Sequence, residues 1–328
     1  MSVLPTFSYT TDLPDHMTPF LQTLHHFDTV TYCSMGSDMG QQIIKFCIHS
    51  IAIEKPYLMH AVHGISAAHL SHLLPATRHP VQNHQSKLAD AYHWQKALRL
   101  FRSELAAGAN KQNMDALIST VMLICVHQFM LTDPQPDPSK SFVYAPLDKR
   151  EECLRWLAIQ QGFTALWQSL GELVCESIWD PVLRDSDLKQ VVPHFMNADG
   201  HDEVHKLFLE LCHLTQESCE ENNPYYTPLE WLLFLRTLEP NMNSFNKLIT
   251  FVGTLDDRFY HLLRIRDKKA LLILANWLAL MVEIQQWWVS GRCRTECIAI
   301  TTFLMHDVDE RVRNLLEYPA KTVGISLR

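Results

Sequence analysis

The sequence predicts an all-α protein, a single irregular helical domain of about ten helices that encloses an apolar pocket. Three observations favour this class. The chain of 328 residues contains only 10 glycines, and its apolar residues recur at helical spacing over long segments. Hydrophobic residues make up 47% of the chain and charged residues 20%, which is typical of a globular protein and argues against disorder.

Prolines and capping residues indicate where several helices begin and end. Pro56 suits the first turn of a helix and Pro75 its end. Asn113 suits a helix start, and Thr227-Pro228-Leu229-Glu230 resembles a capping box with proline at the first helical position. We expect helices over residues 16–28, 38–52, 56–74, 81–108, 113–131, 148–175, 201–220, 228–238, 243–264, 267–291 and 294–316.

The breaks between these segments do not divide the chain into independent domains. Residues 1–23 form a leader, partly irregular, and residues 24–328 form one helical domain that resembles a ligand-binding domain. Its main interruption is a surface loop at 132–147 that contains three prolines, Pro134, Pro136 and Pro138. A second irregular stretch covers about 179–200, and no repeat of fixed period is present.

Charge and hydropathy exclude several classes of function. The formal net charge is −8, so we expect no direct contact with nucleic acid. No secretory signal opens the chain, and no uninterrupted apolar run is long enough to span a membrane. We therefore expect a cytoplasmic or nuclear protein, not a secreted one, with its nine cysteines reduced.

Cofactor and metal motifs are absent from the sequence. No close pair of cysteines forms a zinc module, and no dinucleotide fingerprint, P-loop or nucleophile elbow occurs. HDEVH at 201–205 places His201 and His205 four residues apart, but Asp202 stands where a zinc protease carries its glutamate. We expect neither a metal nor a cofactor.

Four histidines fall in the apolar segment PYLMHAVHGISAAHLSHLLP at 56–75. Because a helix turns about 100° per residue, His60 and His63 share one side and His69 and His72 another. The four histidines therefore split into two pairs, which argues against one shared metal site.

Six motifs, taken in order, resemble the C-terminal regulatory region of fungal zinc-cluster transcription factors of the sterol-uptake-control type. The first is LHHFDTVTYCSM at 24–35, and the second is P-x-L-x-H-A with S-A-x-H-L within 56–70. The others are Tyr92 with Ala97, Leu98 and Phe101, then WLAIQQG at 156–162, ALLILANWLALMVEIQQWWVSG at 270–291 and LLEYPAKTVGI at 315–325.

This resemblance implies an all-α fold with a pocket for a lipophilic small molecule, sterol-like in the best-known relatives, and makes a homodimer possible. It also implies structural roles for His60 and His69, which match the pattern. Such regulators carry an N-terminal six-cysteine cluster that binds DNA. That pattern is absent from this sequence, so we expect no DNA reader in it.

Polar residues in otherwise apolar segments are the predicted contacts to this ligand. His63 stands where the relatives are usually apolar, and His127 and Gln128 interrupt an apolar run that the relatives keep aliphatic. A buried polar group costs about 1–3 kcal/mol unless it has a partner. Either another side chain or a ligand is expected to supply that partner.

The segment 267–291 carries the other predicted site residues. Asn276, Leu280, Glu283 and Trp287 are spaced to share one helix face, with Trp277 among the apolar walls. A carboxyl group in apolar surroundings tends to hold its proton, so Glu283 suits general acid–base catalysis, as does His127. The alternative is a buried Glu283 paired with a basic residue of a neighbouring helix.

These observations favour a stand-alone protein that binds a terpenoid, sterol-like or polyketide molecule. We expect a cofactor-free enzyme of fungal secondary metabolism, a cyclase or pericyclase of the Diels–Alder type or an isomerase. Such an enzyme would act by holding a reactive ligand in a productive conformation. The alternative is a non-catalytic sterol- or lipid-sensing regulatory protein. A third possibility is an incomplete gene model of an ordinary transcription regulator.

Overall fold

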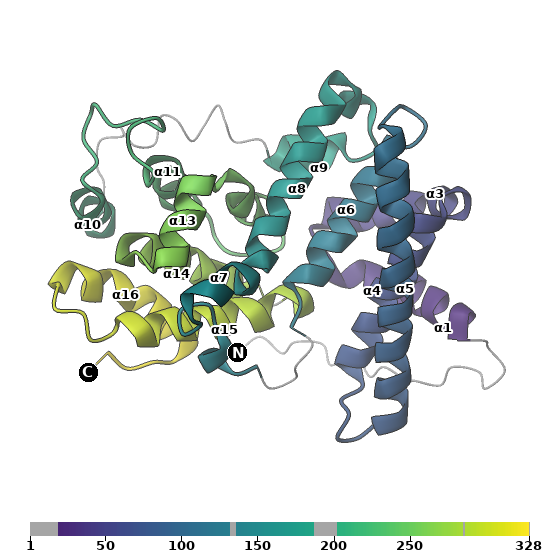
Figure 1. Cartoon of the computed structure of the whole chain (residues 1–328), viewed down its shortest axis with the longest axis horizontal. Coiled ribbons are helices and arrows are strands. Elements are labelled where there is room, and N and C mark those ends of the chain that lie inside the picture. Colours follow the sequence, from purple (N-terminus) through teal and green to yellow (C-terminus); the bar gives the residue numbers. More distant parts are fainter. Residues whose placement is uncertain (1–18, 132–135, 187–201, 285, 328) are drawn as a thin grey trace.

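The computed structural model describes residues 19–131, 136–186, 202–284 and 286–327 (Figure 1). Within these ranges the regular secondary structure is entirely helical, which confirms the predicted class. The α-helices are α1 (Pro19–His26), α2 (Asp38–Ile43), α3 (His49–Glu54), α4 (Pro56–Leu73), α5 (Pro80–Ala107), α6 (Met114–Phe129), α7 (Leu147–Cys153), α8 (Arg155–Leu170), α9 (Asp180–Ser186), α10 (Glu203–Cys212), α11 (Tyr226–Leu235), α12 (Phe245–Thr250), α13 (Asp257–Ile265), α14 (Lys268–Glu283), α15 (Trp287–Leu304) and α16 (Glu310–Val323).

The N-terminal half is built on the long pair α4 and α5, which pack along their length, with α6 beside them (Figure 1). Pro56 occupies the first turn of α4 and the helix ends before Pro75, as predicted. Gly64 permits the close approach of the two helices, because a Cβ atom there would lie 2.8 Å from Nε1 of Trp94 in α5.

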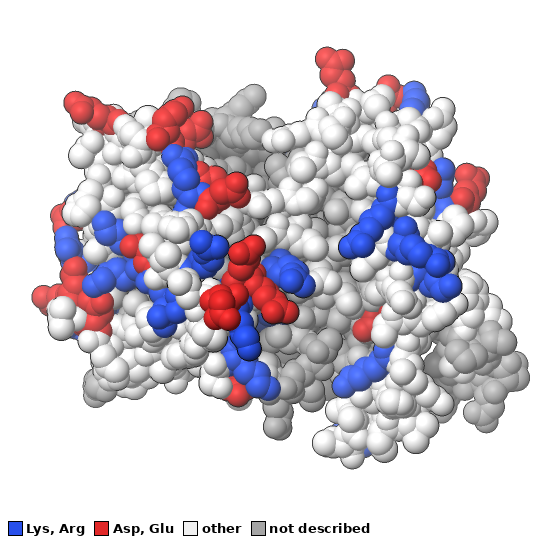
Figure 2. Space-filling view, in the orientation of Figure 1, with Lys and Arg blue, Asp and Glu red and all other residues white. Residues whose placement is uncertain are grey.

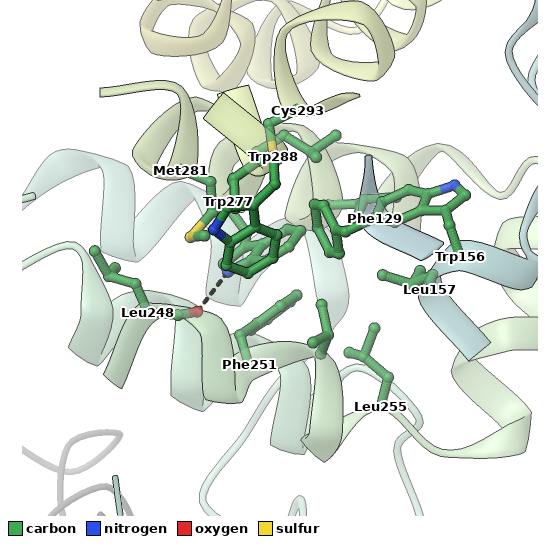
Figure 3. Packing of buried hydrophobic residues seen from close by; sticks show 14 of the residues in the cluster. Phe129, Trp156, Leu157, Leu248, Phe251, Leu255, Trp277, Met281, Trp288 and Cys293 are labelled. Carbon is green, nitrogen blue, oxygen red and sulfur yellow. Dashed lines mark hydrogen bonds between the residues drawn. The ribbon is translucent and has the colours of Figure 1, made fainter. Parts of the chain in front are cut away.

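The C-terminal half surrounds α14, in which every residue from Ala270 to Met281 is buried. A helix that is apolar on all sides belongs in a core, and α11, α12, α13, α15 and α16 pack around this one. Trp277 lies at its centre (Figure 3). Its indole donates to the carbonyl of Leu248 at 2.8 Å and stacks on Phe251, with ring centroids 5.2 Å apart.

Several predicted helices are too long. The segment 148–175 divides at Leu154 into α7 and α8, and 243–264 divides into α12, a 3-10 turn and α13. The segment 267–291 ends as a helix at Glu283, and α15 begins at Trp287. Helical periodicity continues across these breaks, so the pattern alone does not reveal them.

One further expectation needs correction. The proposed capping box fails because α11 already begins at Tyr226, which places Thr227 and Pro228 inside the first turn. The first described helix, α1, begins at Pro19 and lies within the helix expected over residues 16–28. Pro134 of the predicted loop lies outside the described residues, whereas Pro138 begins a short 3-10 turn (Pro138–Lys140).

No helix in the described ranges is both long and apolar enough to cross a lipid bilayer.

Candidate functional site

The principal cavity lies between the two halves of the fold and has a volume of about 550 Å³. One wall comes from α6, with Leu123 and Val126, and another from α8, with Phe163 and Trp167. The remaining walls come from α9, from α12 and the turn after it, and from residues 27–48. Their apolar side chains are Phe27, Met35, Ile44, Ile48, Trp179, Val182, Leu183, Phe245, Ile249 and Val252. Trp231 of α11 and Trp288 of α15 add to the lining.

Gln160 is the unusual polar residue of this cavity. It is only 9% exposed, and its amide has no hydrogen-bond partner among the described residues. The other buried polar side chains of the walls form hydrogen bonds within the protein. Ser119 accepts a hydrogen bond from the Trp179 indole at 2.8 Å, and Asn246 donates to the Ser37 hydroxyl at 2.8 Å. The amide of Gln160 is therefore available to a bound molecule.

Charged residues line one part of the cavity wall, on α9. Asp180 and Arg184 form an ion pair at 2.7 Å. Beside them, Asp185 lies 3.3 Å from Lys247 of α12. The Cys125 thiol also reaches the wall, and burial raises its pKa to about 12, which keeps it protonated and unreactive at neutral pH. The cavity thus combines apolar walls, one free amide and a charged part whose charges are paired.

None of the eight predicted site residues lines this cavity. On α6, His127 turns towards α5, where its Nε2 lies 3.0 Å from Oδ1 of Asp90. Gln128 is half-buried, and its backbone carbonyl lies 3.5 Å from an Arg292 nitrogen. His63 is fully buried in α4; its Nδ1 lies 2.7 Å from the Thr23 hydroxyl.

The other five predicted site residues come from the segment 267–291, and the break after α14 places Trp287 in a different helix from the other four. Asn276 is fully buried and hydrogen-bonded to three groups of the protein, and Trp277 and Leu280 are core residues. Glu283 is exposed and accepts a hydrogen bond from the Tyr318 hydroxyl at 2.8 Å. The prediction that Glu283 lies in apolar surroundings is therefore wrong. Trp287 begins the next helix and stacks on His69, with ring centroids 4.4 Å apart.

The histidines of α4 form two separate groups, as the helical spacing predicted. His60 and His63 both contact His93 of α5, whereas His69 and His72 pack against Trp287. In the described part of the chain, no three histidine, cysteine or carboxylate side chains are placed to hold a metal ion. His201 lies outside the described residues.

Gln160 is not among the site residues predicted from the sequence, although the sequence contains a signal for it. Trp156, Gln160, Phe163 and Trp167 are spaced by four, three and four residues, which places one amide on the aromatic face of a helix. That face is the one that α8 turns inwards, so Gln160 shows the same pattern as Asn276, a single amide on an otherwise apolar helix face.

Comparison with known proteins extends the resemblance seen in the motifs. Residues 22–136 match the family model described as a fungal specific transcription factor domain. The chain is 22% identical over 293 residues to Sterol uptake control protein 2 of Candida albicans, a match that covers 81% of this chain and 38% of the relative. It is 24% identical over 324 residues to a Zn(2)-C6 fungal-type transcription factor of Gibberella zeae, covering 91% of this chain and 61% of the relative.

The chain therefore spans less than two thirds of the length of either relative. Both matches nevertheless extend over most of the chain, well beyond the segment that the family model covers. They confirm that this chain is similar to the C-terminal regulatory region of fungal zinc-cluster transcription factors of the sterol-uptake-control type.

Proposed function

We propose that this chain is a ligand-sensing regulatory domain of the fungal transcription-factor type, and that a lipophilic, sterol-like molecule occupies the cavity between α6, α8, α9 and α12. The similarity to a protein named for the control of sterol uptake supports this function. The volume of about 550 Å³ supports it as well, because it lies in the range of small-molecule sites.

The observation that carries the proposal is the unpartnered amide of Gln160 in an aromatic wall. A ligand with one hydroxyl or carbonyl group on an apolar body would supply the missing hydrogen bond, while its body covers Phe163 and Trp167. Such a ligand is neutral, because the charges on α9 are already paired.

The sensor function has more support than the cofactor-free cyclase. Glu283 and His127, the predicted acid–base residues, lie outside the cavity, and His127 is held by Asp90. The similarity to transcription factors also favours regulation, in the nucleus or the cytoplasm. Catalysis and homodimer formation remain predictions of the sequence.

Binding of dehydroergosterol, a fluorescent sterol, to the purified chain tests the proposal. We expect saturable binding that Gln160→Leu weakens about tenfold, which corresponds to one hydrogen bond of about 1.4 kcal/mol. Ile249→Trp should abolish binding by filling the cavity, whereas the matched control Glu283→Gln should leave it unchanged.

Two results would contradict the proposal. Binding that survives both cavity variants would place the sterol elsewhere. Mass spectrometry of the extracted ligand provides the second test, because a chemically altered compound that accumulates only with the wild-type chain would favour the cyclase.

A further inference from the structure

The outer face of α5 carries a line of side chains that no other element of the described chain covers. Its seven residues, called here the outer α5 stripe, are spaced alternately by four and three positions and are all exposed. The helix turns its other face, with Trp94, Ala97 and Phe101, towards the core. The stripe consists of Val81, Gln85, Leu88, Tyr92, Gln95, Arg99 and Arg102.

The first part of the outer α5 stripe contains three large hydrophobic side chains that are more than half exposed. Val81 is 62% exposed, Leu88 58% and Tyr92 53%. Alternating spacings of three and four place side chains on one seam along a helix, which is the pattern that a second helix recognises. The stripe covers about six turns and is therefore about 30 Å long, enough for a partner helix of similar length.

The second part of the stripe is basic and lacks acidic neighbours. Arg99 and Arg102 lie on it and Lys96 flanks it, with its ammonium group 5.7 Å from the centre of the Tyr92 ring. None of these three forms an ion pair with a carboxylate of the described residues. Figure 2 shows the corresponding gathering of Lys and Arg side chains over α5.

The two carboxylates of α5 interact with residues outside the stripe. Asp90 pairs with His127 at 3.0 Å, and Glu104 accepts a hydrogen bond from Asn113 at 2.9 Å. The chain as a whole has a formal net charge of −8, so this basic face contrasts with the rest of the molecule. Unpaired basic residues beside exposed apolar ones point to a partner that supplies acidic residues.

We propose that the outer α5 stripe is the docking surface for an acidic amphipathic helix of another protein. The apolar residues of that helix would pack on Val81, Leu88 and Tyr92, and its carboxylates would pair with Arg99 and Arg102. A second copy of this chain fits less well, because its stripe offers the arginines no carboxylate. A parallel pairing of two stripes would bring four arginines together, and an antiparallel pairing would place them opposite Val81 and Gln85. No residue of the stripe lines the ligand cavity, so this proposal does not depend on sterol binding.

The test uses two synthetic helical peptides that share leucines at the heptad core positions. One carries glutamate at the flanking positions and the other carries lysine. Fluorescence anisotropy should show saturable binding of the glutamate peptide, weakened by salt, and at least about tenfold weaker binding of the lysine peptide. Leu88→Ser should weaken binding of the glutamate peptide.

Charge reversal gives the sharper test. Arg99→Glu combined with Arg102→Glu should invert the preference, so that the lysine peptide binds more tightly. Both side chains are exposed, so folding should survive, and circular dichroism would confirm it. The matched control, Lys206→Glu with Lys321→Glu, makes the same kind of change at exposed positions on α10 and α16 and should leave the preference intact.

Three results would overturn the proposal. The first is equal binding of both peptides, or a preference that the charge reversal does not change. The second is a wild-type dimer, seen by light scattering, that Leu88→Ser converts to a monomer, since a second copy would then cover the stripe. The third is displacement of the peptide by duplex DNA of random sequence, which would make the surface a phosphate-binding one.

Discussion

The side-chain amide of Gln286 pairs with the backbone of Gly36, 250 residues away in the sequence. The Gly36 N–H donates to Oε1 at 3.0 Å, and Nε2 donates to the Gly36 carbonyl at 3.1 Å. Oε1 also accepts a hydrogen bond from the Trp288 indole at 2.7 Å. Gly36 and Trp288 both line the cavity, so Gln286 fixes two of its walls relative to each other.

Replacing Gln286 with alanine should destabilise the protein by about 2–4 kcal/mol, because the Trp288 indole and the Gly36 backbone lose their partners together. It should also weaken sterol binding, since the two walls are no longer held. Urea denaturation and the dehydroergosterol titration measure the two effects.

The matched control is Gln41→Ala. Gln41 donates one hydrogen bond to the same Gly36 carbonyl at 3.2 Å, but it leaves the Trp288 indole untouched. Its loss should cost less than about 1 kcal/mol. Equal losses for the two variants would show that Gln286 has no special role.

Asn276 and Glu283 lie in one helix but should differ sharply on substitution. Asn276 is buried; it accepts a hydrogen bond from Arg236 at 3.2 Å and donates to the carbonyls of Leu272 and Leu315 at 3.0 and 3.1 Å. Asn276→Ala leaves Leu315 and Arg236 without this partner, at a cost of about 2–4 kcal/mol. Glu283→Ala removes an exposed acceptor and should cost less than about 1 kcal/mol.

Thermal unfolding of the two variants provides the comparison. An equally large loss for Glu283→Ala would mean that its hydrogen bond with Tyr318 holds α14 to α16 more firmly than an exposed contact should. A small loss for Asn276→Ala would mean that water replaces the amide.

Acidification should destabilise the fold through its buried histidines. Burial, reinforced by neighbouring histidines, lowers the pKa of His63 and of His69 to about 3. In the unfolded chain these histidines bind protons near pH 6.5. Their neutral, buried forms therefore contribute fully to the free energy of unfolding above that pH, and this stability is lost as the pH falls towards the folded-state pKa. Each such group contributes about 1.4 kcal/mol per pH unit in that interval.

Glu230 acts in the opposite direction. Burial, and then the charge of Glu220, raises its pKa to about 7, so protonation of this residue stabilises the fold as the pH falls. His63→Gln isolates the histidine contribution, because Glu230 is common to both proteins. Between pH 7 and 5, the wild-type chain should lose about 2 kcal/mol more than His63→Gln, measured by urea denaturation at each pH. Parallel curves would show that His63 takes up no additional proton on unfolding.

The sequence by itself determined the fold class and most of the helices, because helical periodicity and proline positions are local properties. Pro56 and Pro75 bound α4 in the chain as in the structure, and the six motifs already pointed to the fungal regulators that the comparisons match. The division of the α4 histidines into two pairs also followed from the helical repeat alone.

The tertiary structure decided which polar residues face a cavity. Glu283 and Trp287 share a face only if one helix continues through residue 285, and the break between α14 and α15 places them in different surroundings. Asn276 is satisfied by Arg236, at the end of α11, and by α16, whereas Gln160, an equally isolated amide on an apolar helix face, has no hydrogen-bond partner within the described ranges of the chain. Periodicity shows which side of a helix is buried, but only the packing of other helices determines whether that side meets protein or space for a ligand.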